Sequence, residues 1–472
     1  MRSRRRLLAL AAAVAIGALT LPPLRAEAGP PPTTINGTFN DGVGTVNYLI
    51  EVPASWNHTL VLYSHGYVTP GPVNPALDVG DPVTGKWLLD HGYALAGSSY
   101  STTGWAIQQA LPDQIQTLAI FNTKVGHPTH TIAWGHSLGG IITAGLIQQY
   151  PGTFDAALPM CGVVSGGVGT WNQALDSAFA FQRLLGQGSG IQLVNITNPA
   201  ANLGLAEGIA AAAQGTAQGQ ARLALSAALG DTPGWFTPLS AEPAATAYAA
   251  QEANQYMWAS QVDFPFAFAL RAELETRAGG NPSWNTDVDY ETQLERSPSR
   301  AEVRALYRAA GLDLNADLDA LNASPRIHNN AASTRYLANN ITFNGDLDIA
   351  VLTMHTTGDG LVVNQNEQTY RDVVTEAGDS SLLRQTYVHR AGHCAFTPAE
   401  TITAFQTLIG RLKTGHWDDS TDASLMNTKA AALGPEANVF AVGQTIVPTS
   451  AAFLHFRPTV FLRPFERGDD QG

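Results

Sequence analysis

Short apolar segments alternate with polar stretches of helical length in the first third of the chain. The apolar segments are residues 60–63, 93–96, 131–134 and 156–160, and the last three each follow a stretch long enough for a helix. Continuous apolar runs of this length are typical of strands buried on both faces, so the pattern predicts a mostly parallel sheet with helices on both faces. Residues 35–52 alternate apolar and polar positions between glycines, which predicts an antiparallel hairpin.

The strand pattern disappears from residue 165 to residue 340, a region rich in Ala, Gln and Leu. It predicts a helical insertion; within it, Ser299 to Glu302 has the spacing of a capping box and Gly311 the position of a helix stop. Apolar strands return at 348–354 and 383–388, and a helix is predicted over 398–413. We therefore expect a core in two halves, residues 35–164 and 341–414, with the insertion, residues 165–340, between them. An irregular tail is expected over residues 415–472.

The N-terminus has the composition of an export signal. Four arginines among the first six residues precede an apolar stretch over 7–21, and Ala26-Glu27-Ala28 follows as a small-x-small cleavage pattern. The basic run also resembles a twin-arginine signal. The alternative is a membrane anchor, but fifteen residues are short for a bilayer span. The pattern predicts a signal peptide over 1–28 and a secreted or periplasmic protein without stable membrane insertion, since no later stretch has 18 uninterrupted apolar residues.

Composition excludes several classes of protein. The chain carries 39 acidic and 26 basic residues, a formal net charge of −13, so neither nucleic acid nor an anionic lipid surface is an expected partner. The 44% of hydrophobic residues is enough for a large core. Two cysteines are too few for a disulfide scaffold or a cysteine-type zinc site, and no phosphate loop, dinucleotide fingerprint or metal-ligand spacing is present, so we expect no cofactor and no metal.

The motif Gly135-His136-Ser137-Leu138-Gly139 stands directly between the strand at 130–134 and an apolar helix at 141–150. A serine nucleophile must stand on a sharp strand-to-helix turn, and small residues two positions before and after it permit that turn. The N-terminus of the following helix favours a developing negative charge. The pattern predicts Ser137 as a nucleophile; the alternative is a structural serine in a glycine-rich turn.

At this point the chain resembles the α/β-hydrolase family, which orders its triad as serine, then an acid after a late strand, then a histidine near the C-terminus. By that resemblance Asp359, in the turn after the strand at 348–354, is the acid, and His393, after the strand at 383–388, is the base. Rival residues have structural interpretations. Asp346 and Asp348 precede their strand, His389 lies at a strand end, and His355 is a structural histidine or a neighbour of the site.

The resemblance also implies an oxyanion hole made of two backbone N–H groups. One is that of Leu138, the residue after the nucleophile. The other is that of Tyr67, because Ser64-His65-Gly66-Tyr67 resembles the family's His-Gly motif, in which His65 would bond within its own loop.

Cys161 and Cys394 both follow predicted strands and should lie at the same edge of the sheet, beside the site. In an exported chain they are expected to form a disulfide. Tannases and fungal-type feruloyl esterases similarly bridge the loop of the catalytic histidine, but from a cysteine directly before the nucleophile. That position here is His136, so the similarity is partial and implies no substrate.

These expectations describe a secreted serine esterase that acts through an acyl-enzyme on a small-molecule or polymer-derived ester. An exported serine peptidase on the same fold, using carboxylates such as Asp287, Asp289 and Glu291 to bind an amine, stays open as an alternative, and so does a non-catalytic binding protein. The oligomeric state also stays open. The insertion carries aromatic side chains, some of which should line an acyl or aryl pocket: Trp171, Trp235, Trp258, Trp284, Phe264, Phe266 and Phe268.

Overall fold

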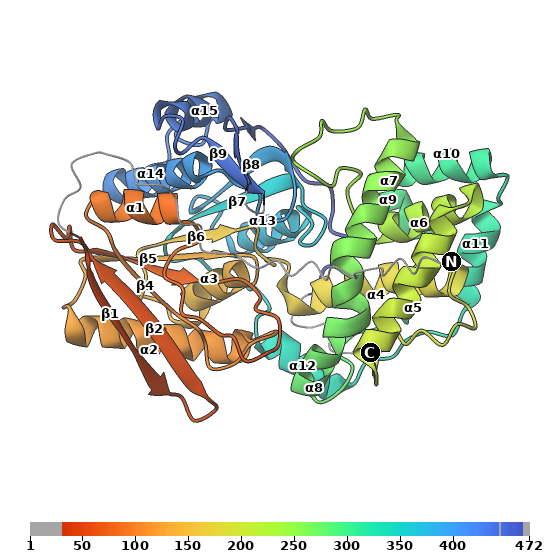
Figure 1. The fold of residues 1–472 in the computed structure, drawn as a ribbon, viewed down its shortest axis with the longest axis horizontal. Helices are drawn as coiled ribbons and strands as arrows, with labels where there is room; N and C mark the ends of the chain where they lie inside the picture. Colours follow the sequence, from red (N-terminus) through yellow and green to blue (C-terminus); the bar gives the residue numbers. More distant parts are fainter. Residues whose placement is uncertain (1–30, 443–444, 466–472) are drawn as a thin grey trace, which may run out of the picture.

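The computed structural model describes residues 31–442 and 445–465, in which a nine-stranded sheet lies beside a layer of helices (Figure 1). The signal peptide predicted over 1–28 lies outside these residues. The strand order is β1-β2-β4-β3-β5-β6-β7-β8-β11. The strands are β1 Thr33–Asn40, β2 Thr45–Val52, β3 Thr59–Ser64, β4 Ala94–Ser98, β5 His130–His136, β6 Ala156–Met160, β7 Ala350–Gly358, β8 Leu383–Ala391 and β11 Phe453–Leu454.

Strands β3 to β8 are parallel to one another, whereas β2 is antiparallel to β4 and β11 is antiparallel to β8. β1 and β2 form the predicted antiparallel hairpin. β4 lies between β2 and β3, so the chain crosses over between β3 and β4 before the sheet continues with β5. A parallel sheet with this crossover, and with β2 antiparallel beside β4, is the α/β-hydrolase fold. The predicted fold class is therefore confirmed.

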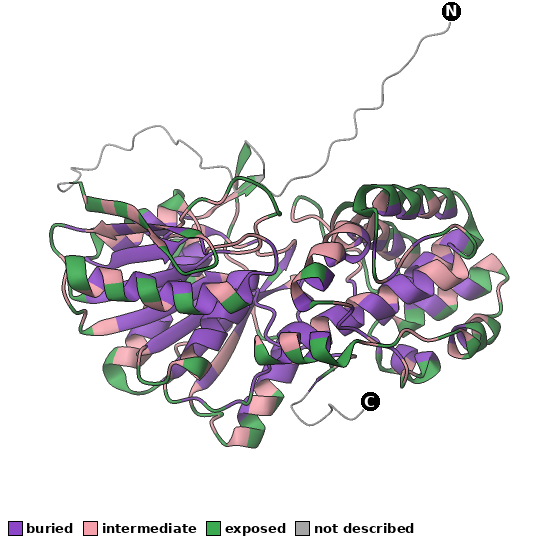
Figure 2. Ribbon diagram, turned by 90° about the horizontal axis from the view of Figure 1, so that it is seen from below, coloured by how far each residue is buried: buried purple, intermediate pink, exposed green. Residues whose placement is uncertain are grey.

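The alternation of side chains along each strand gives the sheet two buried faces. Leu60 and Leu62 of β3 lie in one apolar core, and Val61 and Tyr63 lie in the other. Helices α2 Ile107–Lys124, α3 Leu138–Gln149 and α13 Asn366–Ala377 contribute to the first core, and α1 Pro82–Asp90, α14 Pro398–Thr414 and α15 Ala423–Ala432 contribute to the second. Figure 2 shows the buried strands between helices whose outer faces are exposed.

The insertion forms a helical layer beside the carboxyl edge of the sheet (Figure 1, yellow to cyan). It has its own apolar core, which includes Phe181, Leu225 and Phe268. Two segments between α7 and α8 are π-helical, which the sequence pattern did not predict. The elements are α4 Gly166–Leu184, α5 Pro199–Gln214, α6 Ala217–Leu229, α7 Tyr248–Trp258, η1 Ala259–Asp263, η2 Phe266–Leu270, α8 Arg271–Ala278, α9 Tyr290–Arg296, α10 Arg300–Ala310, α11 Leu314–Ala323 and α12 Ala331–Asn339.

The tail is more ordered than its composition suggested. It contains α15, a hairpin of β9 Val439–Val442 and β10 Thr445–Pro448, and the edge strand β11. Beyond β11, Arg463 donates to Asp176 of α4 at 2.6 Å, and the ring of Phe465 packs edge-to-face on Trp284. The tail therefore connects the last strand of the core to the insertion.

A buried ion pair joins β8 to α14. Arg390 donates to both carboxylate oxygens of Glu400, at 2.5 and 2.9 Å, and Glu400 also accepts the backbone N–H groups of Thr397 at 2.7 Å and Ala452 at 2.9 Å. The Thr397 hydroxyl in turn accepts the N–H of Glu400, which completes a capping box. One carboxylate therefore holds the end of β8, the start of α14 and the tail together.

We expect Glu400→Gln to lower the free energy of unfolding by about 3–5 kcal/mol, because it leaves the buried Arg390 guanidinium without a counter-charge. Chemical denaturation measures the loss. The matched control is Glu295→Gln, which breaks an exposed pair with Arg304 and should cost less than about 1 kcal/mol. Equal losses in the two variants would contradict this account.

Candidate active site

Ser137 stands on a strained turn between β5 and α3. Its backbone φ is 57° and its ψ is −121°, a conformation that a residue with a side chain rarely adopts. Gly135 and Gly139 make the turn possible: a Cβ on Gly135 would lie 2.3 Å from the carbonyl oxygen of Gly139, and one on Gly139 would lie 1.9 Å from that of Ser64. The turn raises the serine hydroxyl above the carboxyl edge of the sheet.

The structure brings Ser137, His393 and Asp359 into one hydrogen-bonded chain. His393 Nε2 lies 2.7 Å from Ser137 Oγ, and His393 Nδ1 lies 2.8 Å from Asp359 Oδ2. Asp359 directly follows β7, and His393 lies two residues after β8. With a proton on Nδ1 donated to Asp359, Nε2 is free to accept the serine hydroxyl proton.

Asp359 is buried and fully hydrogen-bonded. Its Oδ1 accepts the backbone N–H groups of Leu361 at 3.1 Å and Val362 at 3.0 Å. Burial alone would raise the pKa of this carboxyl, but the neighbouring histidines His393 and His355 hold the pKa below its ordinary value. The acid is therefore a carboxylate near neutral pH.

Tyr67 and Leu138, the residues predicted for an oxyanion hole, line the same cavity as Ser137. Leu138 is the first residue of α3, where backbone N–H groups have no partner within the helix. A Cβ on Gly66 would lie 3.4 Å from Cβ of Ser137, so the loop of Tyr67 passes close to Ser137. His65 stacks on Tyr100 and bonds through Nδ1 to the carbonyl of Gly66 at 2.7 Å, within its own loop.

Cys161 and Cys394 form a disulfide, with their Cα atoms 5.4 Å apart. Cys161 directly follows β6, and Cys394 directly follows His393. Because the backbone N–H of Cys161 also bonds to the carbonyl of Met354 on β7, at 2.8 Å, the loop that carries His393 is tied to the middle of the sheet.

A cavity of about 130 Å³ opens beside Ser137. Its lining is mostly apolar and comes from both the core and the insertion; an apolar cavity of similar size in another protein holds one benzene molecule. Four of the expected aromatic side chains line it, namely Trp171, Phe264, Phe266 and Phe268, together with Tyr67 and Trp105. Trp235, Trp258 and Trp284 are not among its lining residues. Trp258 instead packs over Gly360, where a Cβ would lie 2.4 Å from its ring.

Asp263 also lines this cavity, and sequence reasoning did not single it out. It ends the π-helical segment η1. Burial, with the nearby charge of Asp359 as a second cause, raises its pKa well above the ordinary value. The carboxylates proposed from the sequence for amine binding do not line the cavity: Asp289, for example, caps α9 by accepting the N–H of Thr292 at 2.7 Å.

The rival residues lie elsewhere. His389 is half-exposed and pairs with Glu242 at 3.2 Å. Asp346 and Asp348 precede β7 and line a separate small pocket at the other end of the sheet. His355 lies directly behind Asp359. Among the described residues, no group of three or more His, Cys, Asp or Glu side chains is arranged to hold a metal, and no helix is long and apolar enough to cross a membrane.

Comparison with known proteins relates the chain to hydrolases. Residues 42–264 match a tannase-like family of unknown function. The chain is 27% identical over 445 residues to an o-phthalyl amidase from Xanthobacter agilis, across 87% of this chain and 96% of that protein. Two structures from Aspergillus oryzae each align with 81% of this chain and 80% of their own: an esterase (11% identity, TM-score 0.43) and feruloyl esterase B (13%, 0.39). The strand order and the turn at Ser137 are those of the α/β-hydrolase fold.

Proposed function

We propose that this protein is an exported serine hydrolase that cleaves carboxylic esters through an acyl-enzyme intermediate. The observation that carries the proposal is the hydrogen-bonded chain from Ser137 Oγ through His393 to Asp359, at the mouth of an apolar cavity. A non-catalytic binding protein would have no need of this chain or of the strained turn beneath Ser137.

In the proposed reaction, Ser137 Oγ attacks the ester carbonyl while His393 takes its proton. The carbonyl oxygen becomes an oxyanion that accepts hydrogen bonds from the N–H groups of Leu138 and Tyr67. His393 then protonates the alcohol oxygen as the bond between this oxygen and the acyl carbon breaks, and the acyl group remains on Ser137. A water molecule, deprotonated by His393, attacks the acyl-enzyme, and the carboxylic acid departs as Ser137 recovers its proton. Asp359 stabilises the imidazolium of His393 during both acylation and deacylation.

The cavity favours an acyl group with a single aromatic ring. Its volume and its aromatic lining suit one ring, and binding would transfer the apolar surface of that ring from water into the cavity. Amide hydrolysis is the second candidate, because the chain is similar along most of its length to a protein named o-phthalyl amidase. The peptidase alternative has less support, since the carboxylates expected to bind an amine lie away from the cavity.

Export is supported by the signal-like composition of residues 1–28 and by the disulfide, which persists in oxidising compartments. If the twin-arginine route is used, the chain folds before export and the bond forms afterwards.

Ser137→Ala should lower ester turnover by at least about 10³-fold, because the acyl-enzyme can no longer form. Steady-state kinetics on a p-nitrophenyl ester and labelling with a fluorophosphonate probe measure the effect. The control is Thr356→Ser, which keeps the hydroxyl that donates to the carbonyl of Gly392, next to His393, at 2.8 Å; it should be labelled like the native protein. Substantial turnover or labelling of the Ser137→Ala variant would refute the assignment.

An aroyl substrate should be preferred over an acetyl one by at least about tenfold in kcat/KM, since only the ring fills the cavity. The comparison uses p-nitrophenyl benzoate and p-nitrophenyl acetate, with benzoyl, 2-carboxybenzoyl and aminoacyl p-nitroanilides alongside. Faster turnover of the aroyl anilides than of the esters would favour an amidase. Faster turnover of the aminoacyl anilides than of the esters would favour a peptidase. Preference for acetate would exclude the aromatic acyl group.

Replacing both cysteines by serine should lower the free energy of unfolding by about 2–5 kcal/mol and reduce kcat, because the loop of His393 loses its tether to β6. Thermal unfolding and steady-state kinetics measure the two effects. Retention of full activity, or two free thiols in the exported native protein, would show that the bond does not hold the loop.

A further inference from the structure

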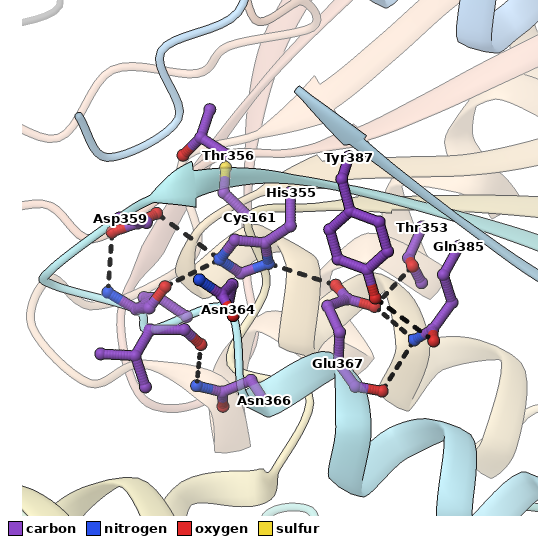
Figure 3. Close-up of polar contacts among 12 residues, drawn as sticks. Cys161, Thr353, His355, Thr356, Asp359, Asn364, Asn366, Glu367, Gln385 and Tyr387 are labelled. Atoms are coloured by element: carbon purple, nitrogen blue, oxygen red, sulfur yellow. Dashed lines mark hydrogen bonds and ion pairs between the residues drawn. The ribbon is translucent and has the colours of Figure 1, made fainter. Parts of the chain in front are cut away.

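Next to Asp359 lies a second buried acid–base pair that the proposed mechanism does not use. His355, on β7, is fully buried between Asp359 and Glu367, and Glu367, on α13, is 1% exposed. Figure 3 shows the imidazole of His355 between the two carboxylates.

Each ring nitrogen of His355 faces an oxygen atom that can accept a hydrogen bond. Nε2 lies 2.7 Å from the carbonyl oxygen of Val362 and 3.6 Å from Asp359 Oδ2. Nδ1 lies 3.2 Å from Glu367 Oε1. A neutral imidazole carries only one N–H, so the ring donates to both oxygens only when it is doubly protonated and positively charged.

Glu367 is held in place by neighbours on two strands. Its Oε2 accepts the hydroxyl of Thr353, on β7, at 2.5 Å and the amide of Gln385, on β8, at 2.6 Å. The same amide donates to the backbone carbonyl of Glu367 at 2.8 Å. These contacts, drawn in Figure 3, fix the start of α13 against the two strands that carry Asp359 and His393.

We propose that His355 and Glu367 form a positioning pair that acts through Asp359. The imidazolium of His355, held in place by Glu367, keeps the buried Asp359 ionised and, through the carbonyl of Val362, fixes the turn whose N–H groups bind Asp359. Asp359 can then hold His393 in the tautomer that accepts the Ser137 proton. This inference rests on the proposed function of the three residues.

The charges around the pair agree with this role. His393 and Asp263 lie next to Asp359, and Tyr370, Tyr387 and Arg371 lie around Glu367. Burial and Glu367 raise the pKa values of both tyrosines, so neither tyrosine contributes a charge.

Burial alone would lower the pKa of His355, but the carboxylates of Asp359 and Glu367 raise it to about 10. Because this value lies above that of an unfolded histidine, about 6.5, the pair's stabilising contribution is complete below about pH 6.5. It is lost as the pH rises through about 10.

The test is the rate of fluorophosphonate labelling of the full chain between pH 5 and 9, which needs no knowledge of the substrate. Without the positive charge of His355, both Asp359 and His393 bind protons more readily. We expect His355→Gln to slow labelling at pH 7 by about tenfold and to move the acid limb of the profile upward by about one pH unit. His355→Lys, which keeps a positive charge, should return the limb toward its native position.

The matched control is His130→Gln, which removes a histidine that lies 3.5 Å from Asp155 at the start of β5, far from the site, and should leave the profile unchanged. An acid limb that stays at its native pH in a folded His355→Gln variant would overturn the inference. A native protein that the probe does not label would instead overturn the proposed function.

Nitrogen NMR of the native protein provides a measurement that does not depend on a variant. At pH 8 both ring nitrogens of His355 should carry protons, whereas a neutral ring would overturn the inference even if His355→Gln fails to fold.

Discussion

The carboxyl ends of β5, β7 and β8 meet at one edge of the sheet, and the geometry of the candidate site depends on that register. Backbone pairing across β6 aligns Met160 with Met354, and pairing of β7 with β8 brings Gly358 opposite Ala391. Asp359 and His393 follow these last two positions, so hydrogen bonds of the main chain set the separation of the two side chains. The disulfide and the pair of Arg390 with Glu400 then fix the loop between β8 and α14 from both sides.

Ser137 lies between two buried regions of different polarity. On one side, the insertion and the core enclose a cavity whose lining is mostly apolar. On the other side, Asp359, His355 and Glu367 are buried ionisable groups, which would be costly alone and are tolerated because they contact one another and make further hydrogen bonds. The candidate site therefore has a mostly apolar cavity on one side and a cluster of buried polar side chains around Asp359.

Sequence patterns predicted the parts of the fold that depend on local chemistry. The strand Ala156–Met160 and the start of α14 at Pro398 agree with their predicted bounds, because apolar runs and a proline at a helix start are strong local signals. The predicted meeting of Ser137, Asp359 and His393 came from the chain order that the resemblance implied. What failed depends on tertiary packing. Ser299 accepts no capping hydrogen bond, whereas the buried Glu302 accepts the amide of Gln255, and the spacing of residues alone cannot reveal that competition. The π-helical segments, and with them the position of Asp263 on the cavity, likewise follow from how the insertion packs over the site.

The central claim is that Ser137 carries the acyl group during turnover. Stopped-flow measurement of p-nitrophenolate released from p-nitrophenyl benzoate, with acid quench and peptide mass spectrometry, tests it most directly. Where deacylation is the slower step, the account predicts a burst of about one p-nitrophenolate per chain and a benzoyl group on the peptide that contains Ser137. A burst with no acylated peptide, or with the acyl group on another residue, would contradict it.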